Sequence, residues 1–543
     1  MTGWDELKSS VIDKNNCCLC GTCIGICPVS RIIASDEQIT CNETECIHCG
    51  KCIAVCPGNG FDYDTENKKL FHEDRLGFHN EFGYYRSILK GFANNARIRD
   101  KASSGGALTA LSCYLLDNHE VDYVVGVVNN GSDCRVEAIR TTEEAICAAQ
   151  SKYVFLPVNS ILQYIRKNQG RYMFVGLPCQ IEGMRNAAKT DPLIAERIVI
   201  YAGLFCGFNL SALATDYLIK KSGIEEGSIL SVEYRAKENG KTGFKITSDK
   251  KDFFISKHGY TILNAVYSRE RCWKCYDYTA EFADISFGDA WEEKNGYSRI
   301  IVRSEKAEQL VKELCETGNI SIFPSGEEDI YKTQERIVNF KKKDIVARKK
   351  LLKDFPVNNV EYHQIGFIRC VKAALFLYLL KFGQTEFCRK LLGIMPIQMV
   401  EKLSINLRSG SLAEFFRYLF WGIMTTAVNL FCFWGLQKVG LNYRISNLLT
   451  ILFTKVAAFI FNKFFVFKTP LKSRKTFLGE LIRFALTRGA TGVLDYFGLI
   501  LLVDHLSVDK YIGKTFMLII VTLLNYFLGK FIVYKKADFT KND

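Results

Sequence analysis

The chain has 543 residues, 48% of them hydrophobic, and a formal net charge of +13 from 71 basic and 58 acidic residues. This length supports three or more domains. Much of the basic excess flanks apolar segments, which favours a membrane surface over nucleic acid as the partner. Residues 1–14 lack an apolar signal-peptide core, so the 21 cysteines do not indicate secretion. We expect a reducing, cytoplasmic environment for the N-terminal part.

Residues 1–70 are dominated by the pattern CxxCxxCxxxCP, which occurs twice. Thiolates at this spacing bind iron–sulfur clusters, and in two-cluster ferredoxins the fourth cysteine of each run serves the other cluster. The first 4Fe-4S cluster is therefore assigned to Cys17, Cys20, Cys23 and Cys56. The second is assigned to Cys46, Cys49, Cys52 and Cys27. A disulfide or zinc site is the alternative, although zinc needs only four ligands. Cys18 and Cys41 receive no role.

Residues 82–165 have the pattern of an α/β layer. Residues 102–116 (ASSGGALTALSCYLL) predict a helix, and residues 121–128 (VDYVVGVV) predict a buried strand. The helix begins after Ser103, Ser104, Gly105 and Gly106. Serine and glycine at a helix start can present backbone N–H groups to an anion. An ordinary glycine-containing turn explains the same residues, and the sequence alone favours this turn over an anion site.

Residues 166–355 place four more cysteines at the ends of predicted elements. The strand at 173–175 leads into Cys179, the strand at 198–206 ends in Cys206, and Cys272 and Cys275 form a CxxC pair. Four thiolates suffice for a third 4Fe-4S cluster. Buried free thiols, or a redox-active CxxC, remain the alternatives.

The order SSGGALTAL, GLPCQI, FCG, CxxC and ADISFGD resembles the coenzyme F420 hydrogenase/dehydrogenase beta-subunit family, in members that carry their own ferredoxin domain. The resemblance covers residues 1–350 and implies an FAD-containing iron–sulfur oxidoreductase, with ferredoxin or reduced F420 as a redox donor. It implies that Ser103, Ser104, Gly105, Gly106 and Asp289 lie at the flavin. It also implies that a cluster near the flavin is held by Cys179, Cys206, Cys272 and Cys275.

Two segments precede the most apolar part of the chain. Residues 331–355 are rich in lysine and arginine, and a solvated helix is the favoured interpretation, with a basic face on anionic lipid as the alternative. Residues 356–411 are predicted to form a linker. Its apolar stretch 367–380 is shorter than the ~20 residues of a bilayer span, which is typical of an interfacial or packed helix.

Four apolar segments follow, at 419–436, 445–461, 485–503 and 512–531, each near the ~20 residues that span a bilayer. Lysine and arginine gather between the second and third segments and after the fourth. The positive-inside rule then places both termini in the cytoplasm. NKFFVFK at 462–468 recurs as GKFIVYK at 529–535, which indicates a duplicated helical hairpin. Lys455 and Asp495 are predicted to contact each other or a ligand, with helix–helix hydrogen bonding as the alternative.

Residues 412–536 resemble the GtrA-like family through FRYLFWGIMTTAVN, NKFFVFK and GKFIVYK. That resemblance implies a multi-pass domain in the inner (cytoplasmic) membrane that handles polyprenyl-phosphate-linked sugars for cell-surface polysaccharides. The whole chain is therefore predicted to be multidomain. It would join an α+β dicluster ferredoxin module, an α/β flavin-binding oxidoreductase domain and an all-α four-helix transmembrane domain.

The function predicted from these parts is a membrane-anchored iron–sulfur flavoprotein that performs a reduction in the synthesis or export of a surface glycan. One alternative is an electron-relay subunit without a substrate of its own. Another is a translocator of polyprenyl-linked sugars with an accessory redox domain. No GxGxxG of the Rossmann type follows a strand, so a nicotinamide site of that kind is not indicated.

Overall fold

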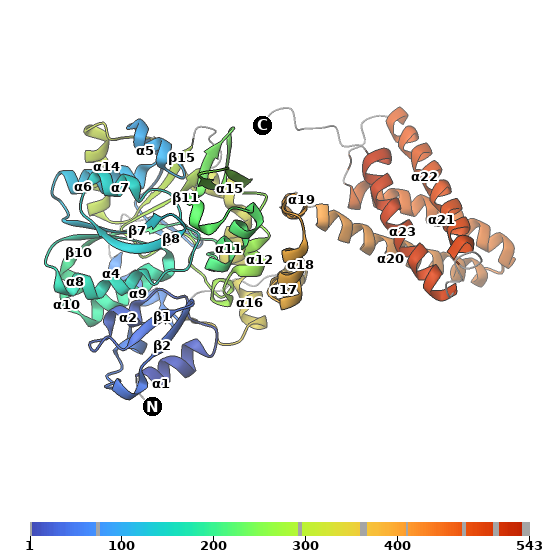
Figure 1. The fold of residues 1–543 in the computed structure, drawn as a ribbon. Helices are drawn as coiled ribbons and strands as arrows, with labels where there is room; N and C mark the ends of the chain where they lie inside the picture. The colour runs from blue at the N-terminus through green and yellow to red at the C-terminus, as the bar shows by residue number, and fades with distance from the viewer. Residues whose placement is uncertain are drawn as a thin grey trace. The chain divides into compact units, whose positions relative to one another are not determined.

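The computed structural model describes residues 3–71, 77–290, 296–358, 366–408, 411–467, 469, 474–502 and 510–534 (Figure 1). The chain forms two compact units, Met1–Ser404 and Ile405–Asp543. The first unit contains the dicluster, α/β and linker segments. The predicted boundaries between those segments stay predictions, although strands from both 82–165 and 166–355 enter one sheet.

The first unit is built around a mixed eight-stranded sheet. Its order is β16 (Ile320–Pro324), β6 (Ser87–Ala93), β15 (Tyr297–Val302), β14 (Ile285–Ala290), β10 (Ile198–Leu204), β9 (Tyr172–Gly176), β7 (Tyr123–Asn130) and β8 (Asp133–Ile139). The neighbours β14, β10, β9 and β7 run parallel, and the remaining pairings are antiparallel. The strands predicted at 121–128, 173–175 and 198–206 are thereby confirmed as members of the parallel core.

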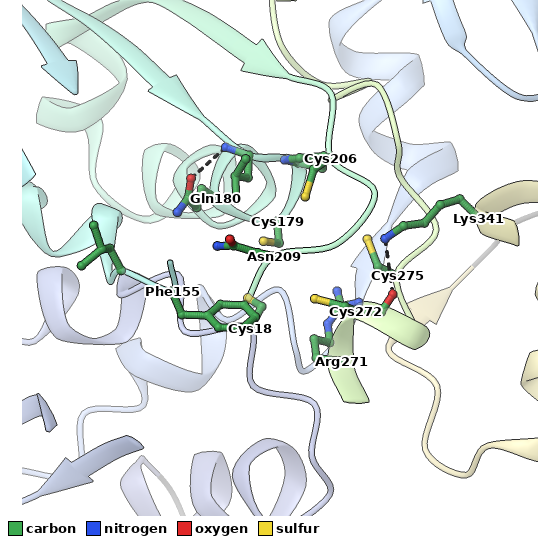
Figure 2. A pocket seen from close by; sticks show the side chains of 13 residues that line it. Cys18, Phe155, Cys179, Gln180, Cys206, Asn209, Arg271, Cys272, Cys275 and Lys341 are labelled. Atoms are coloured by element: carbon green, nitrogen blue, oxygen red, sulfur yellow. Dashed lines mark hydrogen bonds between the residues drawn. The ribbon is translucent and has the colours of Figure 1, made fainter. Parts of the chain in front are cut away.

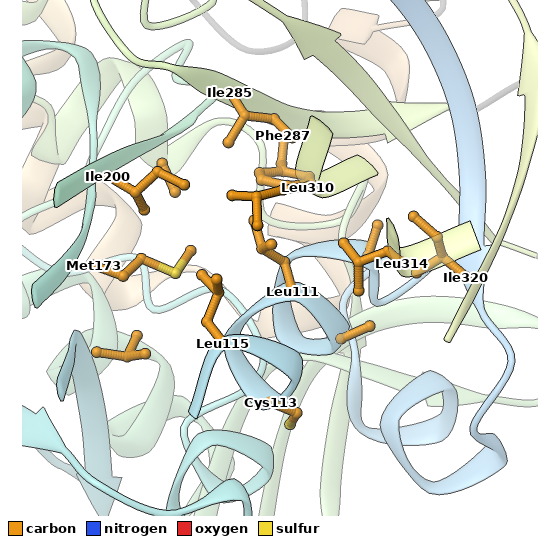
Figure 3. Close-up of a cluster of buried hydrophobic side chains, with 14 of the residues drawn as sticks. Leu111, Cys113, Leu115, Met173, Ile200, Ile285, Phe287, Leu310, Leu314 and Ile320 are labelled. Carbon is orange, nitrogen blue, oxygen red and sulfur yellow. The ribbon is translucent and has the colours of Figure 1, made fainter. Parts of the chain in front are cut away.

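Each face of the sheet has its own hydrophobic cluster, because successive strand residues point to opposite sides. Met173 and Ile200 pack with α6 (Ala107–Asp117) and α14 (Glu305–Glu316) on one face (Figure 3). Phe174 and Tyr201 pack on the other face with α8 (Leu162–Lys167) and α9 (Pro178–Thr190). The helix predicted around 108–116 is thus α6, and its apolar side is core.

The N-terminal module joins the second of these faces. It contains α1 (Trp4–Leu7), α2 (Thr22–Ile26), α3 (Lys51–Ala54) and the hairpin of β1 (Ile32–Ser35) and β2 (Gln38–Cys41). Its side chains Ile26, Val55 and Phe61 belong to the same buried cluster as Phe174 of β9. The module therefore shares the hydrophobic core of the α/β sheet and does not form a separate compact unit.

A smaller layer follows in the sequence. It consists of β11 (Ile229–Glu238), β12 (Lys241–Ser248) and β13 (Phe253–Ser256), packed with α11 (Ala212–Ser222) and α12 (Leu263–Tyr267). The unit continues with α15 (Glu327–Val338), α16 (Ile345–Leu351), α17 (Phe367–Gly383) and α18 (Glu386–Ile394). The boundary between the two units falls within the next helix, α19 (Ile397–Arg408).

The second unit is helical. It contains α20 (Ser411–Lys438), α21 (Tyr443–Ile460), α22 (Arg474–Ile500) and α23 (Lys510–Leu528). In the part of the chain that is described, no helix combines the length and the apolar character needed to cross a membrane. The prediction of four spans is therefore not confirmed. Lys455 is exposed, and the side chain of Asp495 lies outside the described part.

The duplication predicted from the two lysine motifs has a structural counterpart. A π-helical turn follows α21 at Phe461–Val466, and another follows α23 at Gly529–Val533. Lys463 Nζ lies 2.5 Å from Glu480 Oε2, and Lys530 Nζ lies 3.0 Å from Glu414 Oε1. The lysine that follows each hairpin thus pairs with a glutamate at the start of the other hairpin. The sequence motifs contain the lysines, but their acidic partners are apparent only in the structure.

Candidate cofactor sites

The cysteines predicted for the first N-terminal cluster are neighbours in space. Cys23 interacts electrostatically with Cys17 and with Cys56 of the other run, and Cys20 also interacts with Cys56 and Cys23. Gly21 makes the turn between them with φ 86°, and its α-carbon faces Pro157 so closely that a Cβ would lie 2.5 Å from the Pro157 carbonyl oxygen. Burial raises the pKa of Cys17 to about 11. A thiolate there needs a cation such as a bound metal beside it.

The second predicted set is more open to solvent. Cys52 interacts with Cys46 and Cys49, and Cys49 is exposed. Cys41 interacts with Cys46, Cys27 and Cys52, so a cysteine without a predicted role belongs to this group. Burial raises the pKa of Cys52 to about 11. The assignment of Cys27 to the second cluster and of Cys56 to the first, as in two-cluster ferredoxins, stays a prediction.

One pocket is lined by all four cysteines predicted for a third cluster (Figure 2). Cys179 follows the end of β9 and Cys206 follows the end of β10, so both lie at the carboxyl edge of parallel strands, where α/β sheets bind ligands. Cys272 lies in α13 (Glu270–Trp273), and Cys275 follows it. Burial raises the pKa of Cys206 to about 12.

Cys18 is a fifth cysteine on the wall of this pocket (Figure 2). It comes from the N-terminal module, and its thiol interacts electrostatically with Cys179 of the pocket and with Cys20 of the first N-terminal set. No role is predicted for it from the sequence, because Cys18 is surplus to the CxxCxxCxxxCP run and no local pattern relates it to Cys179. Cys18 therefore lies near both the first N-terminal set and the pocket.

Two buried cations face the same pocket. Arg271 is 3% exposed, and its Nε and Nη1 have no hydrogen-bond partner among the described residues. Lys341 is 1% exposed and donates through Nζ to the Cys272 carbonyl oxygen at 3.3 Å. Unsatisfied buried donors are costly. Cations beside five thiols suit an anionic group such as a thiolate-bound cluster. Within the described residues, no three His, Cys, Asp or Glu side chains are placed to hold a single metal ion.

The basic segment 331–355 is not the solvated helix that the sequence predicts, and it does not form a uniform basic face. Lys341, Lys342 and Arg348 are buried. Arg348 donates to the carbonyl oxygens of Trp273 and Cys275, and Lys342 pairs with the buried Glu281. These side chains fix the loop that carries Cys272 and Cys275. Charge runs are normally solvated, and here the loop carbonyls and a buried carboxylate supply the partners.

The serine and glycine residues predicted at the flavin have packing roles. Ser104 Oγ lies 3.2 Å from Ser298 Oγ. Gly106 adopts φ 81° before α6, and a Cβ on Gly105 would lie 2.5 Å from the Gly91 carbonyl oxygen. These glycines let α6 approach the sheet closely, as the ordinary-turn interpretation expects.

Arg235 links two of the predicted flavin residues, and sequence analysis missed it. Its guanidinium donates to Asp289 Oδ2 at 2.9 Å and to the Ser103 carbonyl oxygen at 3.2 Å. The side chain is 6% exposed, and its Nε has no partner in the described part of the chain. Lys257 Nζ lies 3.9 Å from the same Asp289 carboxylate. A buried donor and a second cation fit the phosphates of FAD.

Comparison with known families finds matches to three parts of the chain. Residues 88–163 match the N-terminal domain of the coenzyme F420 hydrogenase/dehydrogenase beta subunit, and residues 169–327 match its C-terminal domain. Residues 417–534 match the GtrA/DPMS transmembrane domain.

Individual relatives fall into the same two groups. The chain is 29% identical over 290 residues to the coenzyme F420 hydrogenase subunit beta of Methanococcus voltae, covering 50% of this chain and 97% of that protein. It is 27% identical over 323 residues to the coenzyme F420-dependent sulfite reductase of Methanocaldococcus jannaschii, covering 56% of this chain and 46% of that protein. The chain thus spans about half the length of that relative. The cell wall teichoic acid glycosylation protein GtcA of Listeria monocytogenes is 36% identical over 121 residues, covering 22% of this chain and 83% of that protein.

Proposed function

We propose that this chain performs a reduction on a precursor of a surface glycan at the membrane. It joins the N- and C-terminal domains of the coenzyme F420 hydrogenase/dehydrogenase beta-subunit family to a GtrA/DPMS transmembrane domain. The beta-subunit family is a type of FAD- and iron–sulfur-containing oxidoreductase. The electrons come from a soluble donor such as reduced F420 or ferredoxin. The observation that carries the redox part is the pocket where Cys179, Cys206, Cys272 and Cys275 meet Cys18 of the N-terminal module.

In this proposal the chain holds three 4Fe-4S clusters and one FAD. Cys17, Cys20, Cys23 and Cys56 hold the first cluster, and Cys46, Cys49, Cys52 and Cys27 hold the second. The pocket cysteines hold the third, where Arg271 and Lys341 balance the negative charge of the thiolates. When bound, FAD connects the two-electron chemistry of an organic substrate with the one-electron chemistry of the clusters.

The flavin is assigned to the region around Ser103 and Asp289. Arg235 connects these residues and offers a free N–H, and Lys257 adds a second positive charge. We infer that both cations bind FAD phosphates and orient the cofactor. Gly105 and Gly106 contribute by letting α6 lie close to the sheet.

The membrane part of the proposal comes from residues 417–534. Their similarity to a teichoic acid glycosylation protein supports a role in surface glycosylation, and we propose a polyprenyl-phosphate-linked sugar as the substrate class. A fused GtrA-like domain would keep that substrate near the redox unit. The proposed location is the cytoplasmic membrane with the redox unit and both termini in the cytoplasm, as the positive-inside rule predicts.

The test is anaerobic purification of the full chain in detergent, with iron, sulfide and flavin counted per chain. We expect about twelve irons and one FAD for three 4Fe-4S clusters. About eight irons would remove the third cluster, and clusters without flavin would contradict the proposed reaction. Reduced F420 and reduced ferredoxin are then offered in turn, with a polyprenyl-phosphate-linked sugar as acceptor. Reduction of an artificial acceptor alone would favour the electron-relay alternative.

A further inference from the structure

The helix α17 carries apolar side chains on two opposite sides. Ala373, Leu377 and Leu380 are buried, and the two leucines pack with Trp273, Phe340 and Leu352 of the redox unit. The other side shows an exposed stripe at the spacing of one helix face, made of Val371, Leu375, Tyr378 and Phe382. A soluble surface helix normally turns a polar face outward.

The next helix extends the same property. In α18, Leu392 is buried while Phe387, Leu391 and Ile394 are exposed, again at helical spacing. Tyr378 is 69% exposed and Ile394 is 82% exposed. We call the stripe on α17 and these three side chains on α18 the outer face. A contiguous apolar face of this kind marks a contact with a membrane or a partner.

Charge and position identify the occupant. Residues 366–408 contain seven basic and two acidic side chains: Arg369, Lys372, Lys381, Arg389, Lys390, Lys402 and Arg408, against Glu386 and Glu401. The match to a transmembrane domain begins at residue 417, nine residues after the end of α19. Apolar side chains flanked by lysine and arginine are typical of helices that lie in the plane of an anionic membrane surface.

We propose that the outer face of α17 and α18 lies in the interface of an anionic lipid bilayer and holds the redox unit against the membrane. This inference rests on the membrane location proposed above. It does not depend on the substrate or on the number of clusters. The buried side of α17 packs beside the loop of Cys272 and Cys275 through Trp273, so the bilayer contact would be rigidly linked to the proposed cluster pocket.

The test uses the full chain in nanodiscs that contain phosphatidylglycerol. A photoreactive p-benzoylphenylalanine replaces one residue at a time, and adducts are identified by mass spectrometry. Tyr378 and Ile394 probe the outer face. Leu230, an apolar residue of β11 that is 59% exposed, is the matched control in the same unit. Phe431, which is 74% exposed in α20, reports on the membrane domain itself.

We expect lipid adducts at positions 378, 394 and 431 and none at 230. Adducts at 431 but not at 378 or 394 would overturn the inference while leaving the membrane location intact. Absence of adducts at all four positions would contradict the membrane location itself. Cross-links from 378 to a second copy of the chain would also overturn the inference. The double variant Lys372→Glu/Lys381→Glu should lower the lipid adduct yield at position 378 about fivefold, because each basic side chain attracts anionic lipid. An unchanged yield would contradict the proposed preference for anionic lipid.

Discussion

The molecule brings cysteines together in two different ways. In the N-terminal module, eight predicted ligands lie within residues 17–56, and short turns such as that at Gly21 place them. In the pocket, Cys179 and Cys206 come from the ends of two parallel strands, and Cys272 and Cys275 come from a loop far along the chain. The first arrangement depends on local spacing, and the second depends on the assembled sheet.

The surroundings of the two regions differ as well. Cys49 of the N-terminal module is exposed, whereas the pocket contains the buried cations Arg271 and Lys341. A group bound in the pocket is therefore subject to strong electrostatic interactions in a region of low polarity. This difference suggests that the two regions respond differently to substitution, which the following predictions use.

The largest expected effect is the loss of the cluster proposed in the pocket. The double variant Cys272→Ala/Cys275→Ala should lose about four of the about twelve irons per chain, because two of the four thiolate ligands of one cluster are removed. The N-terminal clusters should keep their electron paramagnetic resonance signals. Iron analysis and that spectroscopy measure the outcome. Cys147→Ala, at an exposed cysteine, is the control. An unchanged iron content in the double variant would place the third cluster elsewhere or remove it.

The features that depend on local spacing could be predicted from the sequence, and the contacts that depend on tertiary packing could not. The CxxC spacing and the β-branched run at 121–128 are readable because short-range pattern determines both. The contact of Cys18 with Cys179 requires the N-terminal module to pack on the sheet face that β9 helps to form. Likewise, Lys341 and Arg348 read as solvated because their partners are carbonyl groups of a distant loop. Burial of polar groups depends on tertiary partners, which no local pattern records.

The second prediction concerns the buried ion pair of Lys342 with Glu281, whose lysine directly follows the pocket residue Lys341 in the sequence. Lys342→Met should lower the free energy of unfolding by about 3–5 kcal/mol, because it leaves Glu281 buried without its partner. Burial already raises the pKa of Glu281 to about 7. Chemical denaturation at constant pH measures the change.

The neighbouring Lys343 supplies a matched control for that measurement. Its side chain is partly exposed and pairs with Glu81 at 2.9 Å. Lys343→Met should cost less than Lys342→Met, on the order of 1 kcal/mol, because this lysine reaches solvent although Glu81 is buried. Equal losses in the two variants would show that the fully buried pair is no more important than the half-exposed one.

The third prediction separates the two regions by their redox potentials. Lys341→Met removes a positive charge from the pocket wall, which disfavours an added electron there. The potential of the pocket cluster should fall by an amount on the order of 100 mV, for a unit charge a few ångströms away at an effective dielectric constant of about 20. Potentials of the N-terminal clusters should change much less. A redox titration followed by electron paramagnetic resonance measures both, and equal shifts in all clusters would argue against a local charge effect.

The smallest effect is expected at Cys18, the side chain between the two regions. Five cysteines line the pocket, and a 4Fe-4S cluster uses four ligands. We expect Cys18 to be the one that does not bind iron, since its neighbours Cys17 and Cys20 already belong to the N-terminal pattern and its thiol lies near both Cys20 and Cys179. Cys18→Ser keeps a hydrogen-bonding group of similar size, so the iron content should stay at about twelve, with a shift in the pocket potential smaller than that of Lys341→Met. A loss of about four irons in Cys18→Ser, with no loss in Cys179→Ser, would instead show that Cys18 is the ligand and Cys179 is not. The N-terminal module would then contribute a ligand directly to the pocket site.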